Sequence, residues 1–191
     1  MNAPYTRSGD WLRIGLLLPI KKGLYAVSPE ITGKPLSLTL VANLLYGPSY
    51  VSMDYALYHY GIIPERVVEV TSMTTRRGKK YDMAVGRFSY THSPPEFYAI
   101  GIDRVENPDK TGFLMASPEK ALCDKLVFTR NLNIKSKEAI AKLVFDDLRI
   151  EEDSLARFDI KVIEACIDAD IKSDMLQALQ HLTHTLQREG V

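Results

Sequence analysis

The sequence predicts an α+β protein with three parts in order: a wing-like hairpin, an antiparallel β-meander with short helices, and a helical C-terminal segment. The spacing of apolar residues shifts toward a period of two between residues 67 and 117, and it becomes helical again after Ser117. Hydrophobic content of 46% and charged content of 25% match an average soluble domain, and 191 residues suffice for a sizeable core.

The first elements are a short helix end and a hairpin within residues 9–27. Lys21-Lys22-Gly23 supplies the hairpin turn. Ser37 is placed to cap a helix that runs to about Tyr46, and Gly47-Pro48 ends it because proline lacks an amide and clashes with the preceding turn.

The stretch GPSYVSMDYALYHYGIIPE, residues 47–65, predicts a second short helix. Ser52 is a plausible N-cap, and Gly61 suits the left-handed position after the last turn. Helical spacing puts an apolar stripe on one face, namely Met53, Ala56, Leu57 and Tyr60. The other face carries Tyr55, Tyr58 and His59, a candidate partner face that we expect to pack against the domain.

Four strands are expected next, in VVEVTSMT, YDMAVGRFSYT, EFYAIGIDRV and GFLMAS. Their short connections favour a largely antiparallel meander. Ser117-Pro118-Glu119 then signals a helix start, Ser136 caps a further helix, and residues 159–169 and 171–188 predict a final helical pair.

Charge is balanced overall, with 24 basic and 24 acidic residues, but unevenly distributed. Residues 1–111 carry a net +3, residues 112–191 a net −3, and residues 145–175 a net −6. This polarity would let one end contact nucleic acid and the other a basic partner, although such charges also decorate solvated helix faces.

Two basic clusters are the candidate nucleic-acid or partner-binding residues. The turn RRGKK, expected at the tip of a hairpin, places four cations together, and Lys21-Lys22 has the position of a wing tip in a winged-helix domain. The candidates are Arg7, Arg13, Lys21, Lys22, Arg76, Arg77, Lys79 and Lys80.

No catalytic, metal or cofactor motif stands out, so we expect a protein that is not an enzyme. The main alternative is a Mg²⁺-dependent nuclease that uses Asp82 or Asp103 with Glu119-Lys120. His181 and His184 lie off the apolar stripe of their helix and are expected on a solvated face. We expect no bound cofactor or metal.

Two cysteines, Cys123 and Cys166, are too few for a disulfide framework and are expected as small buried hydrophobes. Free thiols and the absence of a signal-like start favour a cytoplasmic protein. The apolar run IGLLLPI is far shorter than a membrane span, so no membrane association is expected.

Several segments resemble the AbiEi family, the antitoxin and transcriptional-regulator partners of AbiE-type toxin–antitoxin and phage-defence systems. The resemblance covers roughly residues 14–130, includes LLLPIKKGLYAVS, VTSMTTRRG and GRFSYTH, and is strongest at PSYVSMDYALYHYGIIPE and SPEKALCDKL. It implies a non-catalytic protein in which an N-terminal winged helix-turn-helix binds promoter DNA and an α+β domain opposes a nucleotidyltransferase-like toxin.

The chain departs from that family at its start, where sixteen residues precede the hairpin, too few for a winged helix-turn-helix. We therefore expect residues 1–34 to be a remnant of the winged-helix region. Residues 35–191 would form the antitoxin domain, with helices and meander in 35–117 and helices in 118–191. Promoter DNA and a homo-oligomer are further possible partners, and a stand-alone DNA-binding regulator is a second alternative.

Overall fold

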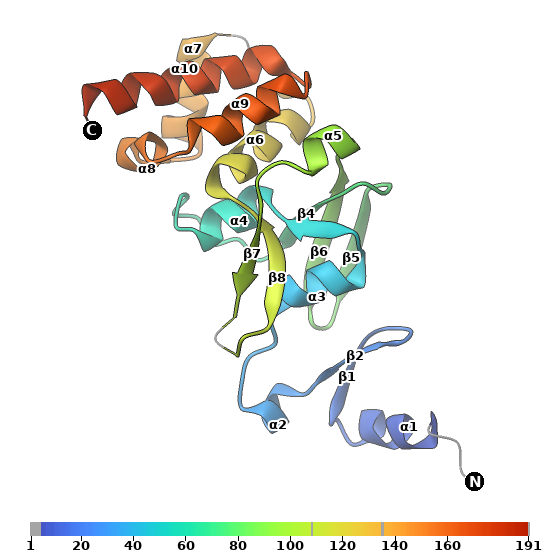
Figure 1. Ribbon diagram of the computed structural model, residues 1–191. Helices are drawn as coiled ribbons and strands as arrows, with labels where there is room; N and C mark the ends of the chain where they lie inside the picture. Colours follow the sequence, from blue (N-terminus) through green and yellow to red (C-terminus); the bar gives the residue numbers. More distant parts are fainter. Residues whose placement is uncertain (1–4, 108, 135, 191) are drawn as a thin grey trace.

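The computed structural model describes residues 5–107, 109–134 and 136–190. Figure 1 shows three tiers: an N-terminal hairpin unit at one end, a β-sheet in the middle and a group of helices at the other end. The α+β class is therefore confirmed. The hairpin unit consists of α1 (Tyr5–Arg13), β1 (Leu17–Lys21), β2 (Leu24–Val27) and α2 (Pro29–Thr32).

The predicted hairpin is present, with β1 and β2 paired antiparallel so that Leu17 faces Val27. Gly23 makes the turn at φ 83°, a left-handed conformation that costs glycine nothing. Ser28 then caps α2, its hydroxyl accepting the Glu30 amide 3.3 Å away.

The central sheet is mixed, which corrects the expected antiparallel meander. Its strand order is β5-β6-β4-β3-β8-β7, and the β4–β6 and β3–β8 pairs are parallel. β6 inserts between β4 and β5, and a three-residue strand that sequence reasoning missed, β3, lies near the centre. The bounds are β3 (Ser49–Val51), β4 (Val70–Thr74), β5 (Lys79–Met83), β6 (Gly86–His92), β7 (Ile102–Glu106) and β8 (Gly112–Ala116).

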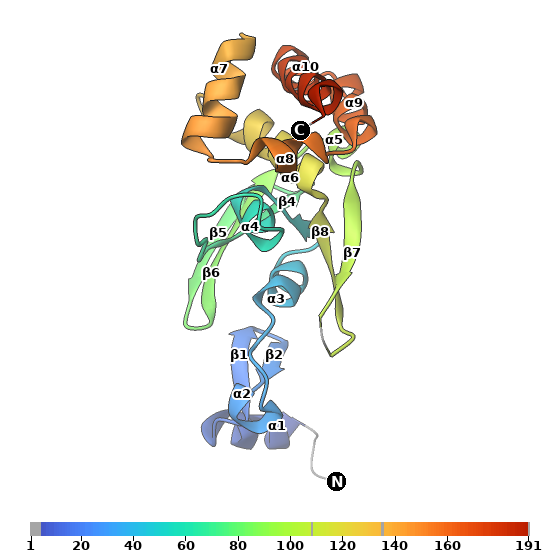
Figure 2. The same ribbon diagram turned by 90° about the vertical axis from the view of Figure 1, so that its left-hand side faces the viewer.

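Three short helices belong to the sheet tier: α3 (Leu38–Leu45), α4 (Met53–His59) and α5 (Pro95–Tyr98). Figure 2 shows α3 lying between the β5–β6 arm and the β7–β8 arm of the curved sheet. The Tyr90 hydroxyl donates to the Ala42 carbonyl at 2.7 Å, and the Asn43 side-chain amide donates to the Leu114 carbonyl at 3.3 Å. These contacts fix α3 against strands on both sides of it.

The C-terminal helices cover the other end of the sheet. The Ser117 and Ser136 hydroxyls cap their helices as predicted, and the predicted final pair is present as α9 and α10. Cys123 and Cys166 are free and buried, as expected. The elements are α6 (Pro118–Phe128), α7 (Lys137–Lys142), a π-helical turn η1 (Leu143–Asp147), α8 (Glu152–Ala156), α9 (Ile160–Asp168) and α10 (Ser173–Glu189).

None of the helices in the described part of the chain combines the length and the apolar character needed to cross a membrane.

Candidate nucleic-acid interface

The basic stretch RRGKK belongs to a crossover and is not a hairpin tip. Because β6 lies between β4 and β5, residues 75–78 must pass over the end of β6, a span of about 10 Å for two strand spacings. The crossover backbone lies close to the end of β6. A Cβ on Gly78 would lie 3.1 Å from the Tyr90 carbonyl oxygen, and His92 Nδ1 lies 3.1 Å from the Arg76 carbonyl oxygen. The backbone that carries the cations is therefore held against the sheet end.

Three tyrosines pack together beneath this crossover. The Tyr46 ring lies 5.1 Å from that of Tyr90 and 6.2 Å from that of Tyr81. The Tyr46 hydroxyl donates to the Arg77 carbonyl at 3.1 Å. The Arg76 guanidinium lies 5.8 Å from the Tyr46 ring, and Lys79 Nζ lies 4.7 Å from the Tyr81 ring. Such cation–π contacts contribute about 0.5–1 kcal/mol each at exposed sites and favour defined positions for the two cations.

Lys21 reaches the same place from the hairpin. Its Nζ donates to the carbonyl oxygen of Leu45, the last residue of α3, where the helix dipole favours a positive charge. Tyr46 is the next residue in the chain. The end of α3 thus brings together two basic clusters that are more than fifty residues apart in sequence.

We call Lys21, Lys22, Arg76, Arg77 and Lys79 the cationic surface; all five side chains are exposed. Among the described residues, none of the ion pairs involves them. Lys80 is also exposed, but strand alternation puts it on the opposite face of β5 from Lys79. It therefore flanks the cationic surface without belonging to it.

Arg13 of α1 is not part of this surface. Arg13 lies 3.6 Å from Asp10 in an exposed ion pair. The helix precedes Leu17 at the base of the hairpin, about 13 Å of strand from the Lys21 end. Arg7 is within α1, but its side chain lies outside the described part of the structure.

The three residues of the candidate partner face of α4 differ in how far they are exposed to solvent. Tyr55 is half-buried, and burial raises the pKa of its hydroxyl. His59 is exposed, but its ring edge contacts the rings of Tyr60 and Phe113, with centroids 5.4 Å and 6.2 Å away, and partial burial lowers its pKa. Tyr58 is exposed. Only part of this face packs against the domain.

A buried polar network, missed by sequence reasoning, joins residues 48–65 to residues 117–126. The Asp124 Oδ2 atom accepts hydrogen bonds from the Ser52 hydroxyl at 2.6 Å and the Tyr50 hydroxyl at 3.0 Å. Lys120 Nζ lies 2.9 Å from Asp124 Oδ1 and donates to the Phe97 carbonyl at 2.7 Å. All four side chains in the network are buried. Ser52 therefore binds Asp124 and does not cap α4, contrary to expectation.

Burial sets the ionisation of this network. It raises the pKa of Asp124, although Lys120 and the two hydroxyl donors favour the charged carboxylate. Burial also raises the pKa of Tyr50, with the Asp124 charge acting in the same direction. Since these groups are closed off from solvent, we assign them to holding β3, α4 and α6 together.

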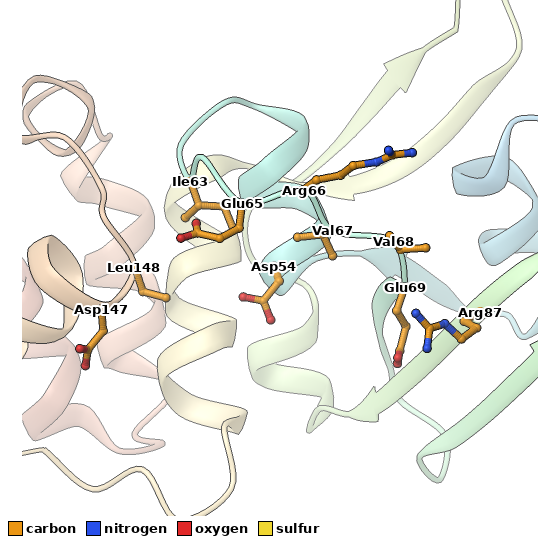
Figure 3. A pocket seen from close by; sticks show the side chains of 10 residues that line it. All are labelled: Asp54, Ile63, Glu65, Arg66, Val67, Val68, Glu69, Arg87, Asp147 and Leu148. Carbon is orange, nitrogen blue, oxygen red and sulfur yellow. The ribbon is translucent and has the colours of Figure 1, made fainter.

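A hollow of about 500 Å³ beside α4 carries several carboxylates (Figure 3). Two of them are already engaged: Asp54 forms an ion pair with Lys125 at 2.8 Å, and Glu65 pairs with Arg149. In Figure 3 Arg66 points away from Asp54, while Arg87 points toward Glu69. The lining therefore mixes paired charges with the apolar residues Ile63, Val67, Val68 and Leu148.

The residues of the nuclease alternative do not come together. Asp82 is on β5 and Asp103 on β7, the two opposite edge strands of the sheet. Glu119 accepts the Asp159 amide at 3.0 Å, and Lys120 is in the buried network. Within the described residues, His, Cys, Asp and Glu side chains form no group of three or more suited to a metal ion. His181 and His184 are exposed on α10.

Neither the models of known protein families nor the curated proteins contain a match to this chain.

Proposed function

We propose that the protein is a non-catalytic antitoxin and transcriptional regulator of the AbiE type, acting in the cytoplasm, which binds nucleic acid through its cationic surface. Its partners would be a nucleotidyltransferase-like toxin and promoter DNA. The observation that carries the nucleic-acid part is the convergence of Lys21 and the 76–79 crossover at the end of α3. The antitoxin part rests on the sequence resemblance.

Unpaired cations on a fixed backbone suit phosphate contacts. Each phosphate that a protein cation neutralises releases condensed counterions, which drives binding and makes it salt-dependent. Cations already occupy ring faces of Tyr46 and Tyr81, so base stacking on these rings is not the expected mode. Contacts of this kind position a protein on nucleic acid without reading its sequence.

The test is a fluorescence-anisotropy titration of a duplex from the gene's own promoter. Replacing Lys22, Arg76, Arg77 and Lys79 together with alanine should weaken binding by at least tenfold and reduce the slope of log K against log salt by about 0.9 per lost phosphate contact. The matched control removes four exposed cations of the helical part, by changing Lys137, Lys142, Lys161 and Arg188 to alanine. Equal effects from the two variants would refute the assigned surface.

A second arm separates an antitoxin from a stand-alone DNA-binding regulator. The genome beside the gene is first searched for a nucleotidyltransferase-like protein, whose absence would count against the antitoxin part; the two proteins are then co-expressed and growth is measured. An antitoxin restores growth, whereas a stand-alone regulator shifts the promoter fragment and leaves the toxicity unchanged. Cleavage of nucleic acid in the presence of Mg²⁺ would instead support the nuclease alternative and overturn the non-catalytic assignment.

A further inference from the structure

The hairpin is apolar on both of its faces. Side chains alternate along a strand and paired residues share a face, so Leu18, Ile20, Leu24 and Ala26 point one way and Leu17, Pro19, Tyr25 and Val27 the other. The first set faces α3, where Ile20 is buried and Leu24 and Ala26 pack against the core. The second set, which we call the outer face, leaves Tyr25 43% and Val27 50% exposed. A hairpin with one solvated face would carry polar residues there.

The rest of the hairpin unit also exposes apolar side chains. Six of the ten large exposed hydrophobic side chains of the described residues lie in the short stretch 11–31, namely Trp11, Ile14, Leu16, Tyr25, Val27 and Ile31. A two-stranded hairpin is marginally stable in water unless its apolar faces are covered. Exposed apolar surface concentrated on one unit in this way is typical of an interaction site.

We infer that the outer face packs against the same face of a second copy of this chain. None of the four side chains of the face is charged, so the surface can meet itself without bringing like charges together. Asp10 and Arg13 at the base of the hairpin are already paired with each other. A two-fold axis perpendicular to the strands makes an antiparallel contact between the hairpins and keeps the Lys21-Lys22 tips of the two copies at opposite ends, where their charges do not meet. Two-fold dimers with self-complementary faces are the commonest oligomers.

Such a dimer carries two cationic surfaces on one particle. A nucleic acid long enough to reach both would bind the second one as an intramolecular event, which raises the overall affinity. This last step rests on the proposed function, whereas the dimer itself does not.

Sedimentation velocity and light scattering over a range of protein concentrations test the inference on the full chain. Wild-type protein is expected at twice the chain mass of 21.5 kDa. Val27→Glu would bury a charge in the interface and should raise the dimer dissociation constant about 100-fold. The matched control is Val68→Glu, at a residue 57% exposed on the loop before β4, which should leave the dimer intact.

Circular dichroism checks that each variant is folded. If Val27→Glu does not fold, Tyr25→Ser with Val27→Thr replaces it, because these residues remove apolar surface without adding charge; weaker dimerisation is again expected. A monomeric wild type overturns the inference, and so does an oligomer that responds equally to the outer-face and Val68 variants.

The same preparations separate this inference from the proposed function. A wild-type dimer that does not bind the promoter duplex refutes the function and leaves the interface standing. A wild-type monomer that binds the duplex through Arg76, Arg77 and Lys79 refutes the interface and leaves the function standing.

Discussion

At the scale of single residues, the core contains a buried ion pair. Lys120 and Asp124 both have fully buried side chains, and Lys120 Nζ lies 3.6 Å from the centre of the Phe97 ring. Burying two ions is costly, and their mutual attraction offsets this only when further hydrogen bonds satisfy both groups. Here Tyr50, Ser52 and the Phe97 carbonyl supply those bonds, so the pair specifies how β3, α4 and α6 meet.

The first prediction concerns this pair. Lys120→Met should lower the free energy of unfolding by about 3–5 kcal/mol, because it leaves the Asp124 carboxylate buried without its cation. Lys125→Met is the matched control, because Lys125 lies in the same helix as Lys120. It breaks the partly exposed ion pair between Lys125 and Asp54 of α4 and should cost about 1 kcal/mol or less. Urea unfolding of both variants measures the difference, and comparable losses would contradict the assignment. Adding Asp124→Leu to Lys120→Met should recover part of the loss.

At the scale of elements, the junction between α5 and β7 depends on a glycine. Gly101 has φ 56°, and its carbonyl accepts the Ser117 amide at 2.9 Å, just before α6 begins. An added Cβ would lie 2.9 Å from both Lys120 Cβ and Val162 Cγ1. Two helices, α6 and α9, therefore leave no room for a side chain at this turn.

Gly101→Ala should combine two penalties. A left-handed conformation costs a non-glycine residue about 1–2 kcal/mol, and overpacking costs typically 1–3 kcal/mol more, so a loss of about 2–4 kcal/mol is expected. Gly61→Ala separates the two effects, since Gly61 has φ 69° but nothing within 4 Å of the added Cβ. Thermal or urea unfolding should rank Gly101→Ala as clearly the more damaging. The same loss in both variants would mean that backbone conformation alone matters.

Local signals predicted most of the longer helices, but α5 lies where the start of the strand EFYAIGIDRV was expected. The capping serines each accept a hydrogen bond from a backbone amide three residues later in the chain, so the interaction depends on neighbouring residues alone. They are Ser37, Ser117 and Ser136. Strand order is different, because it depends on contacts between distant segments. The insertion of β6 between β4 and β5 turned an expected hairpin tip into a crossover, and no spacing in the sequence announces it.

The candidate site could likewise be predicted from the sequence only in part. Basic residues at 21–22 and 76–80 were visible in the sequence, but their meeting depends on where α3 ends. Lys80 and Arg13 were grouped with them by charge alone, and geometry separates them. The buried Lys120–Asp124 pair was missed because charged residues are expected at the surface, and only the surrounding apolar residues hinted otherwise.

At the scale of the whole molecule, charge is separated in space as well as in sequence. The 145–175 segment, with a net −6, forms η1, α8 and α9 in the helical tier. Figure 1 shows α8 and β5 on opposite sides of the molecule. A polyanion that approaches the cationic surface is therefore attracted at one end and repelled by the other.

This polarity should be measurable in nucleic-acid binding. Neutralising Glu151, Glu152 and Asp153 to their amides adds +3 to the net charge at exposed positions at the start of α8, on the opposite side of the molecule from β5. Promoter-duplex affinity should rise several-fold at about 20 mM salt and return to the wild-type value near 0.5 M, where charges more than a few ångströms apart are screened. The comparison is Asp82→Asn, on β5 three residues from Lys79, whose effect should persist to higher salt because its charge is nearer to the cationic surface. If the distant triple variant gained affinity equally at every salt concentration, long-range repulsion would not be the cause, and the helical tier would have to contact the nucleic acid itself.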